Sequence, residues 1–158
     1  MMAAMDQSSD RIPIVLRPGS SLLFAYGTMM RGNRNQARLA LSPTLGRAST
    51  LYQRFALYCV GYAPMAVEDR ENGRTLWGEC YAVRHSTLMR LDRAEGHPWK
   101  YKRKRIDIRL VDGRIVKAWA YLVPRAVLAL EEGKTPVPSG KWKQPTVKHT
   151  LDNTTGMG

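Results

Sequence analysis

The sequence predicts an α+β domain with a curved, mainly antiparallel sheet and short flanking helices. Short apolar runs rich in bulky and β-type residues recur along the chain, as expected for strands. Asp112-Gly113 joins two of these runs and is the strongest hairpin signal in the chain. Another segment spaces its apolar residues at helical intervals. The 158 residues have the length of one domain, and a hydrophobic content of 44% is typical of globular proteins.

The first half of the chain is expected to consist mostly of strands. Residues 1–20 are predicted to be a flexible leader, with prolines and a glycine near its end. The apolar run that begins at Ser21 predicts a buried strand, which Gly27 ends. Two further strand regions, 45–60 and 75–83, are rich in aromatic residues and leucine and are separated by a turn-rich segment.

Two or three short helices are predicted. Asn35 can cap the first, which stops before Pro43 because proline disfavours a helical residue in front of it. Ser86 can open the second, and Gly96 ends it. The third follows Pro124.

Residues 101–111 and 115–123 are predicted to be the two strands of the Asp-Gly hairpin. The apolar residues from Ile106 onward lie on the parity opposite to that of Tyr101. Either Lys102 and Lys104 point into the core, which is costly, or an extra residue near Lys104 shifts the register of the strand. A bulge at this point is the preferred interpretation.

The domain proper is expected to span residues 21–132, followed by a mostly irregular tail, 133–158, which Trp142 holds against the body. Cys59 and Cys80 both lie in apolar runs, so they are interpreted as reduced core thiols of a cytoplasmic protein. No stretch approaches the ~20 apolar residues that span a bilayer, and the start of the chain lacks an export signal. No membrane association is therefore expected.

Basic residues dominate the composition, with 25 Lys and Arg against 13 Asp and Glu and a net charge of +12. Such a balance favours encounter with nucleic acid, acidic lipid surfaces or small anionic substrates. The run 100–105 is the best nucleic-acid candidate, since basic residues surround an aromatic side chain. A strand whose charged side chains face water explains the same pattern and is preferred. The oligomeric state is left open.

Glu95 is the notable acid. It follows Leu88 by seven residues and Leu91 by four, so its carboxylate shares the inward face of the predicted helix. It also lies in the last turn, where the helix dipole opposes an anion. Partial burial and the dipole both raise its pKa toward a value suited to proton transfer. The alternative is a structural ion pair with Arg103 or Arg105.

Gly27 ends an apolar strand and opens a loop whose successive backbone N–H groups can converge on an oxyanion. Many strands end in glycine simply to turn, and the chain contains no standard glycine-rich phosphate motif. The three histidines form no metal-ligand spacing with the cysteines, and nothing marks a serine as a nucleophile. The sequence thus predicts neither a zinc site nor a serine hydrolase.

Several separated motifs resemble one family, the γ-glutamylcyclotransferase-like proteins. Leu23-Phe-Ala-Tyr-Gly-Thr-Met-Met-Arg-Gly32 is similar to the family's Tyr-Gly-Thr-Leu signature. Gly61-Tyr-Ala-Pro-Met65 resembles a segment around a Tyr-Pro pair, here with an alanine inserted, and Trp77-Gly-Glu-Cys-Tyr-Ala-Val83 resembles the Gly-Glu-x-Tyr-x-Val strand. Leu91-Asp-Arg-Ala-Glu-Gly-His-Pro-Trp-Lys-Tyr-Lys-Arg103 is similar to Leu-Asp-x-x-Glu-Gly-x-x-x-x-Tyr-x-Arg. Ser139-Gly-Lys-Trp142 resembles a late family motif.

The resemblance covers about residues 21–123 and implies a small mixed, mainly antiparallel β-barrel flanked by short α-helices. It implies that Glu95 is the general base, with Tyr101 lining the cavity. It further implies that a turn holds the α-carboxylate of a glutamyl substrate, largely through backbone amides. The residues of this turn are Tyr26, Gly27, Thr28 and Met29, the last in place of the usual leucine.

The implied activity is cyclisation of a γ-glutamyl amine, or a related small γ-glutamyl compound, to 5-oxoproline with release of the amine. Such an enzyme needs no metal or other cofactor, because the substrate's own amino group attacks its γ-carbonyl. The competing hypothesis is a non-catalytic binding module of the same fold, whose basic surface contacts nucleic acid or an acidic partner. The leaving amine is not specified by the sequence.

Overall fold

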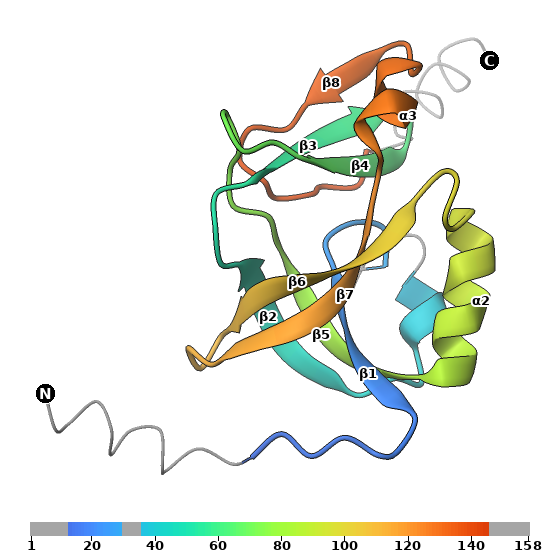
Figure 1. Cartoon of the computed structure of the whole chain (residues 1–158), viewed down its shortest axis with the longest axis vertical. Helices are drawn as coiled ribbons and strands as arrows, with labels where there is room; N and C mark the ends of the chain where they lie inside the picture. Colours follow the sequence, from blue (N-terminus) through green and yellow to red (C-terminus); the bar gives the residue numbers. More distant parts are fainter. Residues whose placement is uncertain (1–12, 30–35, 146–158) are drawn as a thin grey trace, which may run out of the picture.

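The computed structural model of the chain describes residues 13–29 and 36–145. Within this range, five strands close into a barrel in the order β1-β5-β2-β6-β7, and three more form a small sheet in the order β4-β3-β8 (Figure 1). The barrel strands are β1 (Ser20–Ala25), β2 (Thr44–Thr50), β5 (Trp77–Arg84), β6 (Lys102–Leu110) and β7 (Ile115–Leu122). The remaining elements are β3 (Phe55–Val60), β4 (Ala63–Glu68), β8 (Lys134–Pro136), the 3₁₀ helix η1 (Gln36–Leu39), α2 (His85–Glu95) and α3 (Arg125–Ala129).

The barrel is mixed but mainly antiparallel. Its neighbouring strands pair antiparallel, except that β1 and β7 pair in parallel at Leu23 and Trp119. Helix α2 lies beside the barrel, and α3 lies next to β4 of the small sheet (Figure 1). The predicted fold, a small mixed barrel flanked by short helices, is confirmed.

Strand β1 lies at the centre of the core and is buried on both faces. Leu22 and Phe24 belong to one hydrophobic cluster, which also takes side chains from β2, β5, β6 and β7. Leu23 belongs to a second cluster, which includes Leu88 and Leu91 of α2. Because successive side chains of a strand point to opposite faces, β1 joins the barrel interior to the layer beneath α2.

Helix α2 ends where the sequence predicts. Gly96 is left-handed, with φ of 70°, and its N–H donates to the carbonyl of Arg93. The next N–H, of His97, donates to the carbonyl of Asp92. Only glycine adopts this conformation without strain, so the helix stops directly after Glu95.

The predicted bulge near Lys104 is wrong. The pairing of β6 with β7 is continuous from Lys102–Leu122 to Arg109–Ile115, without a shift in register. Lys104 has the same parity as the core residues Ile106, Ile108 and Leu110 but is exposed. Ile106, two residues further along the same face, is buried in the core, whereas Lys104 forms an ion pair with Glu68 of β4.

Several boundaries differ from the sequence-based expectation. The stretch 45–60 is two strands, β2 and β3, which belong to different sheets. The sequence analysis missed β4, a buried strand that contains a proline. The first helix is a single 3₁₀ turn, and Asn35, its expected cap, lies outside the described residues.

The final part of the chain also belongs to the fold. Strand β8 pairs antiparallel with β3, and the N–H of Trp77 donates to the carbonyl of Gly140. Trp142 is buried in the barrel cluster, as predicted. Cys59 and Cys80 are free thiols. In the described part of the chain, no helix is long and apolar enough to cross a bilayer.

Candidate active site

A cavity of about 160 Å³ lies where the exit of β1 meets the end of α2. The start of β4 and the residues just before β6 complete its wall. The cavity brings together all six residues that the sequence analysis selected for the site: Tyr26, Gly27, Thr28, Met29, Glu95 and Tyr101. These residues come from two regions far apart in the chain, 26–29 and 95–101, which the fold makes neighbours.

Glu95 is half-buried as the last residue of α2 and lines the cavity. Burial raises the pKa of its carboxyl, while the nearby positive charges of Arg38 and Lys100 act in the opposite direction. Among the described residues, no side chain forms an ion pair or a hydrogen bond with this carboxylate. The carboxylate is therefore available for a proton or a ligand.

The alternative of a structural ion pair between Glu95 and an arginine of β6 is wrong. Arg103 instead forms two hydrogen bonds with Asp92, one turn earlier on α2. Arg105 lies over the ring of Trp119, at 5.2 Å from its centroid. Neither of these two arginines of β6 therefore pairs with Glu95.

Gly27 is required by packing against the small sheet. A Cβ at this position would lie 2.2 Å from Cγ of Pro64, which no real contact allows. The carbonyl oxygen of Pro64 in turn accepts a hydrogen bond of 2.7 Å from the hydroxyl of Tyr101. The proline holds the turn after β1 and the start of β6 on the same side of the cavity.

Three buried tyrosines build the wall of the cavity, and each donates its hydroxyl to another part of the protein. Tyr26 donates to the carbonyl of Tyr121, Tyr101 to the carbonyl of Pro64, and Tyr121 to Asp92. Burial raises the pKa of all three phenols, so they stay protonated at neutral pH. Glu95 is consequently the group suited to exchange a proton at this site.

Among the wall residues that the sequence analysis did not select, four contribute a charge or a hydrogen-bond acceptor. Arg38 belongs to η1 and Lys100 precedes Tyr101, and their charges influence Glu95. Pro64 and Tyr121 contribute a backbone carbonyl each. Lys100 belongs to the basic run 100–105 and Tyr121 to a predicted strand, so the sequence analysis had considered both segments. Arg38 could not be found in this way, because no local pattern indicates that η1 lies near α2.

The basic run 100–105 is divided between two environments. Lys100 and Tyr101 line the cavity, whereas Lys102 and Lys104 line an open groove of about 660 Å³ beside β4 and α3. Carboxylates occupy the same groove, and two of them form ion pairs, Glu68 with Lys104 and Asp69 with Arg125. The groove therefore carries less positive charge than the basic run 100–105 alone would give it.

Comparison with known proteins gives a consistent result. A family model described as "Gamma-glutamyl cyclotransferase, AIG2-like" matches residues 23–144. A protein of Methanocaldococcus jannaschii named "Putative gamma-glutamylcyclotransferase" is 35% identical over 111 residues, which are 70% of this chain and 90% of that protein.

Solved structures of similar fold agree with this match. An aig2-like protein of Mus musculus superposes with a TM-score of 0.62 at 24% identity, over 81% of this chain and 97% of the mouse protein. YkqA of Bacillus subtilis superposes with a TM-score of 0.62 at 25% identity. That match covers 86% of this chain but only 43% of YkqA.

Proposed function

Because the chain belongs to the γ-glutamyl cyclotransferase, AIG2-like family, we propose that it cyclises a small γ-glutamyl compound, such as a γ-glutamyl amine, to 5-oxoproline and releases the amine. The observation that carries this proposal is the pairing of one half-buried carboxylate with the turn after β1 in a single small cavity. Glu95 is the acid and base, and the turn binds the substrate.

The α-amino nitrogen of the substrate attacks the γ-carbonyl carbon, and a five-membered lactam ring forms. The bond between that carbon and the leaving nitrogen then breaks. Over the whole reaction the α-nitrogen loses two protons and the leaving nitrogen gains two, and Glu95 transfers them one at a time. No water or other reactant is consumed.

The cavity suits this reaction for two reasons. Attack within one molecule needs only that the substrate is held in the reactive conformation, which can supply an effective molarity of ~10⁵ M or more. Burial raises the pKa of Glu95 toward the working pH, so its carboxylate is a stronger base for the ammonium proton than an exposed glutamate and is more often protonated when the amine leaves. Backbone amides of Gly27, Thr28 and Met29 are the proposed partners of the substrate α-carboxylate.

The test is 5-oxoproline release from a panel of γ-glutamyl amines and γ-glutamyl amino acids, measured by mass spectrometry. Glu95→Gln keeps the size of the side chain but removes the base, and it is expected to lower kcat by ~10²–10⁴-fold. Glu71→Gln is the matched control, because that glutamate is exposed and lines the separate groove rather than the cavity. A wild-type protein that releases no 5-oxoproline from any member of the panel contradicts the proposal.

A further inference from the structure

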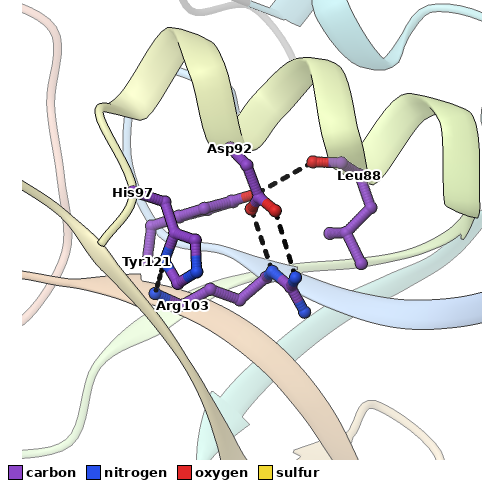
Figure 2. Close-up of polar contacts among 5 residues, drawn as sticks. All are labelled: Leu88, Asp92, His97, Arg103 and Tyr121. Carbon is purple, nitrogen blue, oxygen red and sulfur yellow. Dashed lines mark hydrogen bonds and ion pairs between the residues drawn. The ribbon is translucent and has the colours of Figure 1, made fainter.

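A network centred on Asp92 joins the last turns of α2 to β6 and β7 (Figure 2). Arg103 donates from Nε to Oδ1 of Asp92 at 2.9 Å and from Nη2 to Oδ2 at 3.1 Å. The hydroxyl of Tyr121 lies 2.7 Å from the same Oδ1 and 3.4 Å from the carbonyl oxygen of Leu88. Asp92 is only 8% exposed, although it is charged.

Several contacts stabilise the network in this arrangement. Burial alone would raise the pKa of Asp92, but the hydrogen bonds from Arg103 and Tyr121 and the arginine charge bring it below its ordinary value. The guanidinium of Arg103 stacks on Trp119, at 4.3 Å from the ring centroid. The backbone N–H of Arg103 also donates to Nδ1 of His97 at 3.0 Å. Two parallel hydrogen bonds to one carboxylate fix orientation as well as distance.

The network is connected to two parts of the cavity wall, the end of α2 and the turn after β1. Asp92 lies three residues before Glu95, so the two side chains are neighbours on successive turns of α2. In the other direction, the carbonyl of Tyr121 accepts the hydroxyl of Tyr26, whose backbone begins the turn after β1. A continuous series of hydrogen bonds thus connects the helix that carries the base with the turn that faces it.

We propose that Asp92, Arg103 and Tyr121 are positioning residues, whose network sets the orientation of Glu95 relative to the turn formed by residues 26–29. This inference rests on the function proposed above. None of the three side chains needs to touch the substrate. Misplacement of a catalytic group by about 1 Å can lower the rate by ~10²-fold, so the fixed contact between α2 and the barrel is a requirement of the chemistry.

The first test compares kcat and KM for the best γ-glutamyl substrate. Asp92→Asn weakens the ion pair without changing shape and is expected to lower kcat by ~10–100-fold, with KM changed by less than about threefold. Arg103→Lys keeps the charge but loses the two parallel bonds, so it should lower kcat similarly. Asp107→Asn is the control, because Asp107 pairs with Lys117 at 2.9 Å on the exposed part of the same hairpin, and it should leave kcat unchanged.

The second test separates positioning from general stability. If Asp92 acts through Glu95, Asp92→Asn should add no further loss of rate to the residual activity of Glu95→Gln, although it still lowers the melting temperature. Tyr121→Phe removes a single hydroxyl and serves if Asp92→Asn does not fold. Its kcat should fall by about threefold or more, a smaller loss, because the two hydrogen bonds between Arg103 and Asp92 remain.

The outcomes are distinct. An inactive wild-type protein overturns the proposed function and the positioning role together. An active wild-type protein whose folded Asp92→Asn and Tyr121→Phe variants keep the wild-type kcat overturns the positioning role alone. Losses of rate that add fully to that of Glu95→Gln also overturn it, because they show that Asp92 acts independently of the base.

Discussion

The hydroxyl of Tyr101 donates a hydrogen bond of 2.7 Å to the carbonyl of Pro64. Tyr101 precedes β6 of the barrel and Pro64 lies in β4 of the small sheet, so this bond joins the two sheets at the wall of the cavity. Both residues are buried. The relationship suggests that the shape of the site depends on contacts between the sheets as well as on the residues that face the substrate.

Tyr101→Phe is expected to destabilise the protein by about 1–3 kcal/mol, because the carbonyl of Pro64 loses its buried partner. Chemical denaturation followed by circular dichroism measures the change. Tyr52→Phe is a suitable comparison, since the ring of Tyr52 is half exposed. An equal and small effect for both substitutions would show that the hydrogen bond contributes little.

Gly27→Ala is expected to distort the turn after β1, because the new Cβ overlaps the ring of Pro64. Such overpacking costs about 1–3 kcal/mol, and activity should fall with it. Adding Pro64→Ala removes the Cγ that clashes and keeps the carbonyl that Tyr101 uses, so the double variant should recover part of the stability. Failure of the second substitution to restore any stability would place the strain elsewhere.

The pH dependence of activity should depend on Glu95. The base must be ionised, so kcat/KM is expected to fall at acidic pH, with an apparent pKa above the ordinary value of 4.5. Lys100→Met removes a positive charge that favours the carboxylate, and the acidic limb should then move to higher pH. Lys141→Met should leave the limb in place, because Lys141 lies over the ring of Trp77 and does not line the cavity. A shift toward lower pH for Lys100→Met would contradict the assignment.

Stability should also depend on pH through Glu95. Its pKa is higher in the folded protein than in the unfolded chain, so the folded state binds more protons between these two values. The free energy of unfolding therefore contains a contribution that is lost as the pH rises from about 4.5 through the folded pKa. Glu95→Gln should remove this decrease and be at least as stable as the wild type at neutral pH. Thermal melts of both proteins across the acidic range provide the measurement.

Local sequence patterns predicted many of the elements correctly. The run after Ser21 is apolar at successive positions, as a strand buried on both faces requires, and Asp112-Gly113 has the conformational freedom of a tight hairpin turn. The repeat of Leu88, Leu91 and Glu95 identified both the inward face of α2 and the acid on it. These signals come from short segments of the sequence, so they can be recognised without knowledge of the fold.

The errors concern properties that no short segment contains. Whether Lys104 faces a core or water depends on what lies beside its end of β6, and the structure places Glu68 of β4 there. The pairing of Arg103 with Asp92 rather than Glu95 depends on which turn of α2 rests against the hairpin. Both outcomes require the positions of elements that are distant in sequence.

The sequence by itself determined the types of residue at the site, the main strands and helix, and the resemblance that led to the family. Only the tertiary structure brought Arg38, Pro64 and Lys100 to the same cavity and connected Asp92 to Tyr26 through Tyr121. The physical reason is that burial, charge and hydrogen bonding at Glu95 act through space, and the distances across a closed barrel are unrelated to separations along the chain.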